Sequence, residues 1–361
     1  MKSRLIFPSR VSALVKLNRM LKTEAFKDAK YFILVDENSY NNCLPTLISS
    51  VSALENAEFF EVPVGEEAKS IEIANQLWSS LLDSSADRHS VIVNLGGGCV
   101  SDLGGLVAAG YKRGIRYINI PTTLIGMVDA AIGGKTAVNL ENTKNQVGFF
   151  WQPEAVCIQP DFLETLTEDE VINGLFEVIK TLCLSDKVLL KELLSQLRER
   201  PEEALSTIIK MIPHCASFKE SVVKADPTEQ SVRKILNFGH TFGHGIESFA
   251  MEKGIPMKHG VAVGIGMACA LYLSVKKLGL SEKVLNDYCS FLFSTIDVPH
   301  FSLADTESIL KYMRHDKKNR DNLILCVLLQ ELSLPVIDVA ISENEIRDTL
   351  LRINIIRSSL A

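Results

Sequence analysis

The sequence predicts an α/β, Rossmann-like domain followed by a mainly α-helical domain. Two observations support this fold class. Short apolar runs alternate with amphipathic helical segments through the first 150 residues, as in layered α/β proteins. After a turn-rich passage at 148–160, the pattern changes to nearly continuous helix. We therefore place the domain boundary near residue 160 and expect domains over 1–160 and 161–361.

The strands expected in the first domain are short apolar runs bounded by polar or turn-forming residues. They span 31–35, 58–62, 90–95, 117–120 and 155–158. Between the second and third of these runs, residues 71–82 show the apolar spacing of an amphipathic helix.

The second domain is predicted to be built from helices. Thr167 and Glu170 have the spacing of a capping box, which starts a helix that carries Glu177 and Lys180. Further helices are expected at about 186–199, 201–214, 229–250, 258–278 and 281–294. Two late apolar runs, 323–329 and 334–339, predict a small hairpin.

Composition restricts the class of protein. The chain has 361 residues, of which 47% are hydrophobic and 23% charged, and its net charge of −6 argues against nucleic acid or an anionic membrane as the main partner. The eight cysteines form no CxxC pair, which favours buried thiols in a reducing compartment. We find no signal peptide and no run that reaches the roughly 20 apolar residues of a membrane span, so we expect a cytoplasmic protein.

A glycine-rich turn follows the predicted strand at 90–95. Gly96, Gly97 and Gly98 lead into a predicted helix, an arrangement that turns backbone N–H groups and a helix N-terminus toward a pyrophosphate. The match to the dinucleotide fingerprint is incomplete, because Ser101 occupies the third glycine position and no acid follows about 20 residues later. A tight turn before a helix is the alternative interpretation.

Polar loops at the ends of other predicted strands favour the nucleotide site. Asp36 directly follows the strand at 31–35 and could hold a ribose, while Glu66 and Lys69 follow the strand at 58–62. Thr122 and Thr123 follow the strand at 117–120. Open α/β sheets bind ligands at this edge.

Four polar residues of the second domain are spaced to share one face of a helix. They are Arg233, Asn237, His240 and His244, at spacings of four, three and four residues. Apolar neighbours indicate a buried helix, in which unpaired polar groups are costly. Gly239 and Gly243 form a second, smooth stripe beside them. A ligand or a metal would satisfy these side chains, and a solvated helix face with two hydrogen-bonded histidines is the alternative.

The motifs together resemble those of the 3-dehydroquinate synthases. In chain order they are GGGxxxDLGG from Gly96, Tyr111 to Gly114, Pro121 to Leu124, Asp129, Gly133 to Thr136, Asn139, Lys144 with Asn145, Gly174 to Lys180, Lys219, Asp226, Arg233 to His244, His259 with Gly260, and Asp316 to Lys318. The resemblance covers most of the chain.

The resemblance implies an activity, two cofactors and their ligands. Such enzymes convert 3-deoxy-D-arabino-heptulosonate 7-phosphate into 3-dehydroquinate with NAD, which is regenerated in each turnover, and a divalent metal, usually zinc or cobalt. Glu177, His240 and His259 would bind the metal, although spacing alone would pair His240 with His244. His244 would support the metal site or relay a proton.

The resemblance also implies substrate and cofactor contacts. Substrate contacts are expected from Lys135, Lys144, Asn145, Lys180, Lys219, Arg233, Asn237 and Lys317 or Lys318. Lys219 and Arg233 are expected at the carboxylate end, and Lys135 with Asn145 at the phosphate end. Arg113 would reach across from a second subunit of a homodimer. Cofactor contacts are expected from Asp36, Glu66, Lys69, Gly97, Gly98, Ser101, Asp102, Thr122, Thr123, Asp129, Lys135, Lys144, Phe162 and Thr165.

Two positions depart from the family's pattern. The family commonly has His-Gly-Glu where this chain has His259-Gly260-Val261. A carboxylate that could orient or charge-balance the metal site is therefore missing. Ser101 adds a side chain in the glycine loop. The competing interpretations are another sugar phosphate cyclase, a metal-dependent polyol dehydrogenase of related fold, and a paralogue that binds ligands without turnover.

Overall fold

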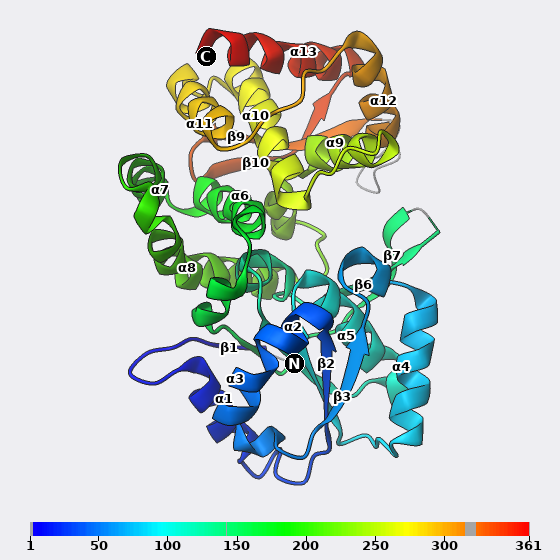
Figure 1. Ribbon diagram of the computed structural model, residues 1–361. Coiled ribbons are helices and arrows are strands. Elements are labelled where there is room, and N and C mark those ends of the chain that lie inside the picture. Colours follow the sequence, from blue (N-terminus) through cyan, green and yellow to red (C-terminus); the bar gives the residue numbers. More distant parts are fainter. Residues whose placement is uncertain (1–2, 142, 315–322, 361) are drawn as a thin grey trace. The chain divides into compact units, whose positions relative to one another are not determined.

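The computed structural model describes residues 3–141, 143–314 and 323–360. It divides into two compact units (Figure 1). Unit 1 comprises Met1–Val171 and Ile212–Ser221, and unit 2 comprises Ile172–Met211 and Val222–Ala361. The boundary expected near residue 160 lies shortly before Val171, where the first segment of unit 1 ends, and no pattern in the sequence indicates that a later segment belongs to this unit.

Unit 1 is built on a six-stranded parallel sheet with the order β1-β8-β5-β4-β2-β3. Its strands are β1 (Arg4–Ile6), β2 (Tyr31–Asp36), β3 (Glu58–Val62), β4 (Val91–Gly96), β5 (Arg116–Pro121) and β8 (Ala155–Cys157). The five strands predicted from apolar runs are confirmed. Every residue of β4 is buried, which explains why its sequence is apolar except for Asn94.

Helices of unit 1 connect and cover the strands (Figure 1). They are α1 (Ala13–Leu21), α2 (Glu37–Asn42), α3 (Leu44–Ser50), α4 (Ile71–Asp83) and α5 (Gly98–Gly110), with 3₁₀ turns at Ser52–Leu54, Gly65–Ala68, Tyr111–Arg113 and Pro160–Thr165 and a π turn at Gly126–Ala130. The core between the sheet and α4 and α5 includes Phe32, Leu34, Ile92, Leu77 and Leu103. Strand β3 lies on one side of β2, and β4, the next strand along the chain, lies on the other side. The direction of winding therefore reverses between β2 and β4. Ligands bind at such reversals in open α/β sheets.

An antiparallel hairpin of unit 1 was not predicted. Strands β6 (Lys135–Leu140) and β7 (Thr143–Phe150) pair with a register shift between Val138 and Leu140. Every residue of β7 is exposed, so its sequence lacks the alternation that marks a half-buried strand.

Unit 2 is mainly helical (Figure 1). Its helices are most of α6 (Glu168–Ser185), α7 (Lys187–Glu199), part of α8 (Ala204–Ala225), α9 (His240–Glu252), α10 (His259–Leu278), α11 (Glu282–Thr295), α12 (Leu303–Arg314) and α13 (Glu343–Leu360), with 3₁₀ turns at Pro201–Glu203 and Val232–Asn237. The predicted hairpin is confirmed as β9 (Ile324–Glu331) and β10 (Leu334–Ile341). The prediction that a helix ends near residue 214 is wrong, because α8 continues through Pro213 on a buried stripe that includes Ile212, Cys215 and Ala216.

The single helix predicted over 229–250 is also wrong. Residues Val232–Asn237 form a 3₁₀ turn, Phe238 is non-helical, and α9 begins at His240. The break lies at Gly239, whose φ of 79° is left-handed and favours glycine. A Cβ there would lie 3.0 Å from the backbone oxygen of Val263 in α10. Arg233 and Asn237 therefore do not share a helix face with His240 and His244.

Two further expectations from composition can be compared with the structure. All eight cysteines are free thiols, and seven of them are buried. Contrary to our reading of the sequence, α10 is long and apolar enough to cross a membrane, but 72% of its apolar window is buried inside the protein. Such burial is typical of a core helix.

Candidate functional site

The three expected metal ligands come together within unit 2. Glu177 lies in the middle of α6, His240 is the first residue of α9, and His259 is the first residue of α10. Glu177 Oε1 is 3.7 Å from Nε2 of His240 and 3.7 Å from Nε2 of His259. The Glu177 side chain is 1% exposed, so its carboxylate is held in a site that strongly favours a compensating cation.

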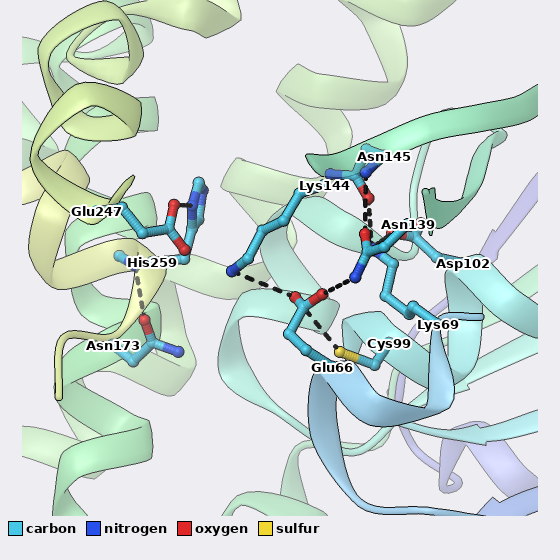
Figure 2. Close-up of polar contacts among 11 residues, drawn as sticks. Glu66, Lys69, Cys99, Asp102, Asn139, Lys144, Asn145, Asn173, Glu247 and His259 are labelled. Carbon is cyan, nitrogen blue, oxygen red and sulfur yellow. Dashed lines mark hydrogen bonds and ion pairs between the residues drawn. The ribbon is translucent and has the colours of Figure 1, made fainter. Parts of the chain in front are cut away.

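Both histidine rings have Nδ1 beside a hydrogen-bond acceptor. His240 Nδ1 is 3.2 Å from the carbonyl oxygen of Phe238, and His259 Nδ1 is 3.1 Å from Glu247 Oε2 (Figure 2). A neutral imidazole that donates from Nδ1 keeps an acceptor lone pair on Nε2. Both Nε2 atoms are thus available to a metal on the side where Glu177 lies.

The spacing of these atoms fits one divalent ion. A tetrahedral ion with ligand bonds of about 2.1 Å separates its ligand atoms by about 3.4 Å. The two measured separations of 3.7 Å are close to this value. One carboxylate and two imidazoles are also donors that zinc and cobalt accept, and three protein ligands leave a position for substrate.

His244 and Lys180 lie beside these ligands. The ligand atoms of His240, His244 and His259 all lie within 4.8 Å of one another. Geometry alone therefore offers His244 as a further metal ligand. Lys180, one turn after Glu177 on α6, places Nζ 2.5 Å from Glu177 Oε2, and both side chains are buried. The ammonium group of Lys180 thus pairs with Oε2 of Glu177, whereas Oε1 faces the two histidines.

Charges also tune His259. Burial by itself lowers the pKa of a histidine, but the hydrogen bond and charge of Glu247 and the charge of Glu177 outweigh it, so the pKa of His259 is raised.

Arg233 and Asn237 belong to a loop organised by an acid. Asp226 accepts hydrogen bonds from the backbone N–H groups of Gln230, Ser231 and Arg233 at 2.7 to 3.0 Å. Burial alone would raise the pKa of Asp226, but these hydrogen bonds lower it to about 2. Arg233 is 2% exposed and donates from one guanidinium nitrogen to the carbonyl of Pro227 at 2.7 Å.

Asn237 is held by the same loop. Its Nδ2 donates to Glu229 Oε1 at 2.7 Å. These two predicted substrate contacts thus lie in one polar loop before α9, although not on one helix.

In unit 1 the expected cofactor contacts cluster at the carboxyl ends of the parallel strands. Asp36 ends β2, Gly97 and Gly98 follow β4, and Thr122 and Thr123 follow β5. The Thr122 N–H donates to the carbonyl of Gly96 at 3.0 Å. A Cβ on Gly97 would lie 3.1 Å from Thr123 Cγ2, so the loop needs glycine where it approaches the neighbouring strand end. Gly97 is the N-cap of α5 and has no side chain to cap the first turn.

A polar network joins expected cofactor and substrate contacts in unit 1 (Figure 2). The buried Lys69 places Nζ 2.7 Å from Asp102 Oδ2 and 2.5 Å from Asn145 Oδ1. Asn139 accepts from the backbone N–H of Asn145 at 2.9 Å. Burial favours a lower pKa for Lys69, but the charges of Asp102 and Glu66 raise it, so Lys69 remains a cation.

Glu66 extends this network on its exposed side. It accepts from Asn139 Nδ2 at 2.9 Å and lies 3.7 Å from Lys144 Nζ. The thiol of Cys99 is 3.8 Å from Glu66 Oε1, and burial together with the Glu66 charge raises the pKa of Cys99 to about 12. The thiol is therefore protonated at neutral pH.

Lys219 lies in the part of α8 that belongs to unit 1. Its Nζ donates to the backbone oxygen of Asp129 at 2.6 Å and forms an ion pair with the Asp129 carboxylate. An expected substrate contact is thus paired with an expected cofactor contact from 90 residues earlier.

Other predicted residues have local structural roles. Asp36 caps α2 by accepting from the N–H of Ser39 at 2.8 Å, and Thr165 donates to the carbonyl of Phe162 at 2.8 Å. Phe162 is buried. Lys135 begins β6 with an exposed side chain. Ser101 is buried in α5, and its Oγ has no hydrogen-bond partner among the described residues.

Two sets of predicted residues remain apart from these clusters. Arg113 is exposed and has a left-handed φ of 68°. Lys317 and Lys318 lie outside the described residues.

Sequence reasoning missed residues that orient others. Glu247 was not a candidate because it lies beyond the polar stripe, although it is seven residues after His240 and so near the same helix face. Asn173 accepts from the N–H of Gly260 at 2.7 Å (Figure 2), a contact across 87 residues that no local pattern indicates.

Comparison with known proteins agrees with this geometry. The family model described as 3-dehydroquinate synthase N-terminal matches residues 59–173, and the model described as 3-dehydroquinate synthase C-terminal matches residues 174–319. A 3-dehydroquinate synthase from Parabacteroides distasonis is 36% identical over 326 residues, which cover 90% of this chain and 92% of that relative.

Solved structures show the same fold. A 2-epi-5-epi-valiolone synthase from Streptomyces hygroscopicus with NAD+ and Zn2+ bound has a TM-score of 0.80 at 24% identity, covering 98% of this chain and 97% of that one. A 2-deoxy-scyllo-inosose synthase complexed with carbaglucose-6-phosphate, NAD+ and Co2+ has a TM-score of 0.79 at 23% identity, covering 97% and 96%. From these matches and its site residues, the chain belongs to the 3-dehydroquinate synthase family.

Proposed function

We propose that this protein is an NAD- and metal-dependent lyase that converts 3-deoxy-D-arabino-heptulosonate 7-phosphate into 3-dehydroquinate and phosphate. The observation that carries the proposal is the approach of Glu177 Oε1 to Nε2 of both His240 and His259, at 3.7 Å each, in a chain that matches both halves of the family. The donor set and its spacing support a divalent ion at this point.

Each unit is assigned one cofactor. The strand ends of unit 1 would hold NAD through the glycine loop and its neighbours, and Glu177, His240 and His259 of unit 2 would hold zinc or cobalt. When bound, NAD supplies a reversible hydride acceptor and the metal supplies a Lewis acid that acidifies a substrate hydroxyl.

The substrate's two anionic groups require cations, and the chain offers them in distinct places. The buried guanidinium of Arg233 matches a carboxylate, because its planar donors can bind two oxygens at once. We assign it to the carboxylate end together with Lys219. Lys135, Lys144 and Asn145, on the hairpin of β6 and β7, suit the phosphate end.

The remaining polar residues would orient the substrate and handle protons. Asn237 offers an amide held by Glu229, and Lys180 offers an ammonium group beside Glu177. His244 lies close to the two ligand histidines, and an imidazole can exchange a proton with a substrate hydroxyl near neutral pH.

Phosphate release is the measurement that tests this proposal. Purified protein incubated with the heptulosonate phosphate, NAD and zinc or cobalt should release one phosphate per 3-dehydroquinate formed, without accumulating NADH. A metal-dependent polyol dehydrogenase would instead accumulate NADH in proportion to product. Release of phosphate from other sugar phosphates alone would indicate a different cyclase, and no release with either metal would contradict the proposal.

Glu177→Gln connects this activity to the metal site. The variant should lose metal-dependent phosphate release by several orders of magnitude, because a neutral amide is a much weaker ligand for a divalent cation than a carboxylate. Glu252→Gln, which changes an exposed acid at the end of α9, is the matched control and should behave as the unchanged protein.

We also infer a homodimer in the cytoplasm. The free cysteines suit a reducing compartment, and the exposed Arg113 is available to a second subunit. Light scattering coupled to size-exclusion chromatography should give twice the 39.9 kDa chain mass.

A further inference from the structure

The two ligand histidines are oriented by different kinds of acceptor. His240 Nδ1 faces the backbone carbonyl of Phe238, whereas His259 Nδ1 faces the carboxylate of Glu247 at 3.1 Å (Figure 2). A carboxylate that accepts from one nitrogen of a metal-binding imidazole fixes the tautomer and makes the other nitrogen a stronger donor to the metal. His259 is therefore the ligand whose strength depends on a side chain.

Glu247 reaches His259 from a neighbouring helix. It lies on α9, seven residues after His240, and its side chain is only 12% exposed. Helix α9 thus contributes one ligand directly and orients a second ligand that belongs to α10. The two helices approach closely, since a Cβ on Gly243 of α9 would lie 3.0 Å from Val263 Cα of α10. The backbone of α9, which carries the Glu247 carboxylate, is therefore held against α10.

The backbone of His259 is held separately. Asn173 lies one turn before Glu177 on α6, and its Oδ1 accepts from the N–H of Gly260 at 2.7 Å. This bond ties the start of α10 to the helix that carries the acidic ligand. Asn173 therefore locates the backbone beside His259, and Glu247 determines how the ring is turned.

The sequence of α10 makes this carboxylate more significant. Val261, two residues after His259, has no polar group, so the start of α10 itself supplies no acid to the site. We propose that Glu247 is a positioning residue that orients His259 for metal binding and strengthens its Nε2 as a ligand. The inference rests on the metal site of the proposed function.

Metal affinity measured by titration is the test. Cobalt absorption spectra and zinc competition with a chelator should show that Glu247→Ala binds either metal 10- to 100-fold more weakly than the unchanged protein, the loss typical of removing such a partner. Glu247→Gln keeps an acceptor oxygen in the same shape but removes the charge, so it should regain part of this loss. Glu252→Ala, on the same helix, is the control and should bind as the unchanged protein does.

The outcomes distinguish failure of this inference from failure of the proposed metal site. If His259→Ala abolishes metal binding but Glu247→Ala binds within twofold of the unchanged protein, Glu247 does not position the ligand and the inference is wrong. If His259→Ala itself binds metal normally, the assigned metal site is wrong instead. Thermal unfolding of the metal-free variants checks folding, and Glu247→Gln, which preserves side-chain volume, provides the decisive comparison should Glu247→Ala unfold.

Discussion

Gly243→Ala tests whether close packing of α9 on α10 sets the metal site. A Cβ at position 243 would lie 3.0 Å from Val263 Cα, 3.1 Å from Val263 N and 3.2 Å from the oxygen of Ala262. Ordinary carbon contacts begin at about 3.5 Å. Because all three neighbouring atoms belong to the backbone, α9 itself must move away by about 0.5 Å. Overpacking of this kind costs about 1–3 kcal/mol, and alanine regains about 1 kcal/mol of helix propensity. We expect a net loss of about 1 kcal/mol.

The assay compares thermal unfolding and metal binding in the same samples. The metal-free variant should unfold roughly 2–4 °C lower, as expected for about 1 kcal/mol in a domain of this size. Zinc should bind on the order of tenfold more weakly, because His240 on α9 moves relative to His259 on α10. Ser248→Ala, on the same helix, improves helix propensity without adding atoms and should not lower either value. An unchanged Tm together with unchanged zinc affinity in Gly243→Ala would refute the packing argument.

Three other substitutions test local features. Lys69→Met leaves the largely buried Asp102 without its ammonium partner, so the unfolding free energy should fall by about 3 kcal/mol, and adding Asp102→Asn should restore part of it; no recovery in this double-mutant cycle would contradict the pairing. Ser101→Ala removes a buried hydroxyl that has no hydrogen-bond partner among the described residues, so the NAD-free protein should gain about 1 kcal/mol in thermal unfolding, whereas a loss would reveal a partner. Asp226 has a folded pKa of about 2, below its usual value, so it stabilises the protein above about pH 4 and this stabilisation disappears as the pH falls toward 2. Chemical denaturation across this window should show a shallower pH dependence in Asp226→Asn, and an unchanged slope would contradict the assignment.

The sequence determined the strands and their ligand-binding edge. Strands β2 and β4 are predictable because central parallel strands are buried on both faces and are therefore mainly apolar. The residues at the ends of these strands, such as Asp36 and Gly97, are then necessarily at the carboxyl edge of the sheet. The motifs around Glu177, His240 and His259 predicted these residues as metal ligands by resemblance to a family, and their side chains lie close together.

Local patterns could not show where a helix is interrupted or which charged residues form pairs. The break at Gly239 follows from its contact with α10, so a regular polar spacing that suggests one helix from Arg233 to His244 is misleading. Partners such as Lys69 with Asp102 and Lys219 with Asp129 are 33 and 90 residues apart. Glu247 acquires its relation to His259 only when α9 packs on α10. Residue type and spacing therefore determined which groups can do chemistry, and tertiary packing decided which of them touch, because close helix contacts join residues that are distant along the chain.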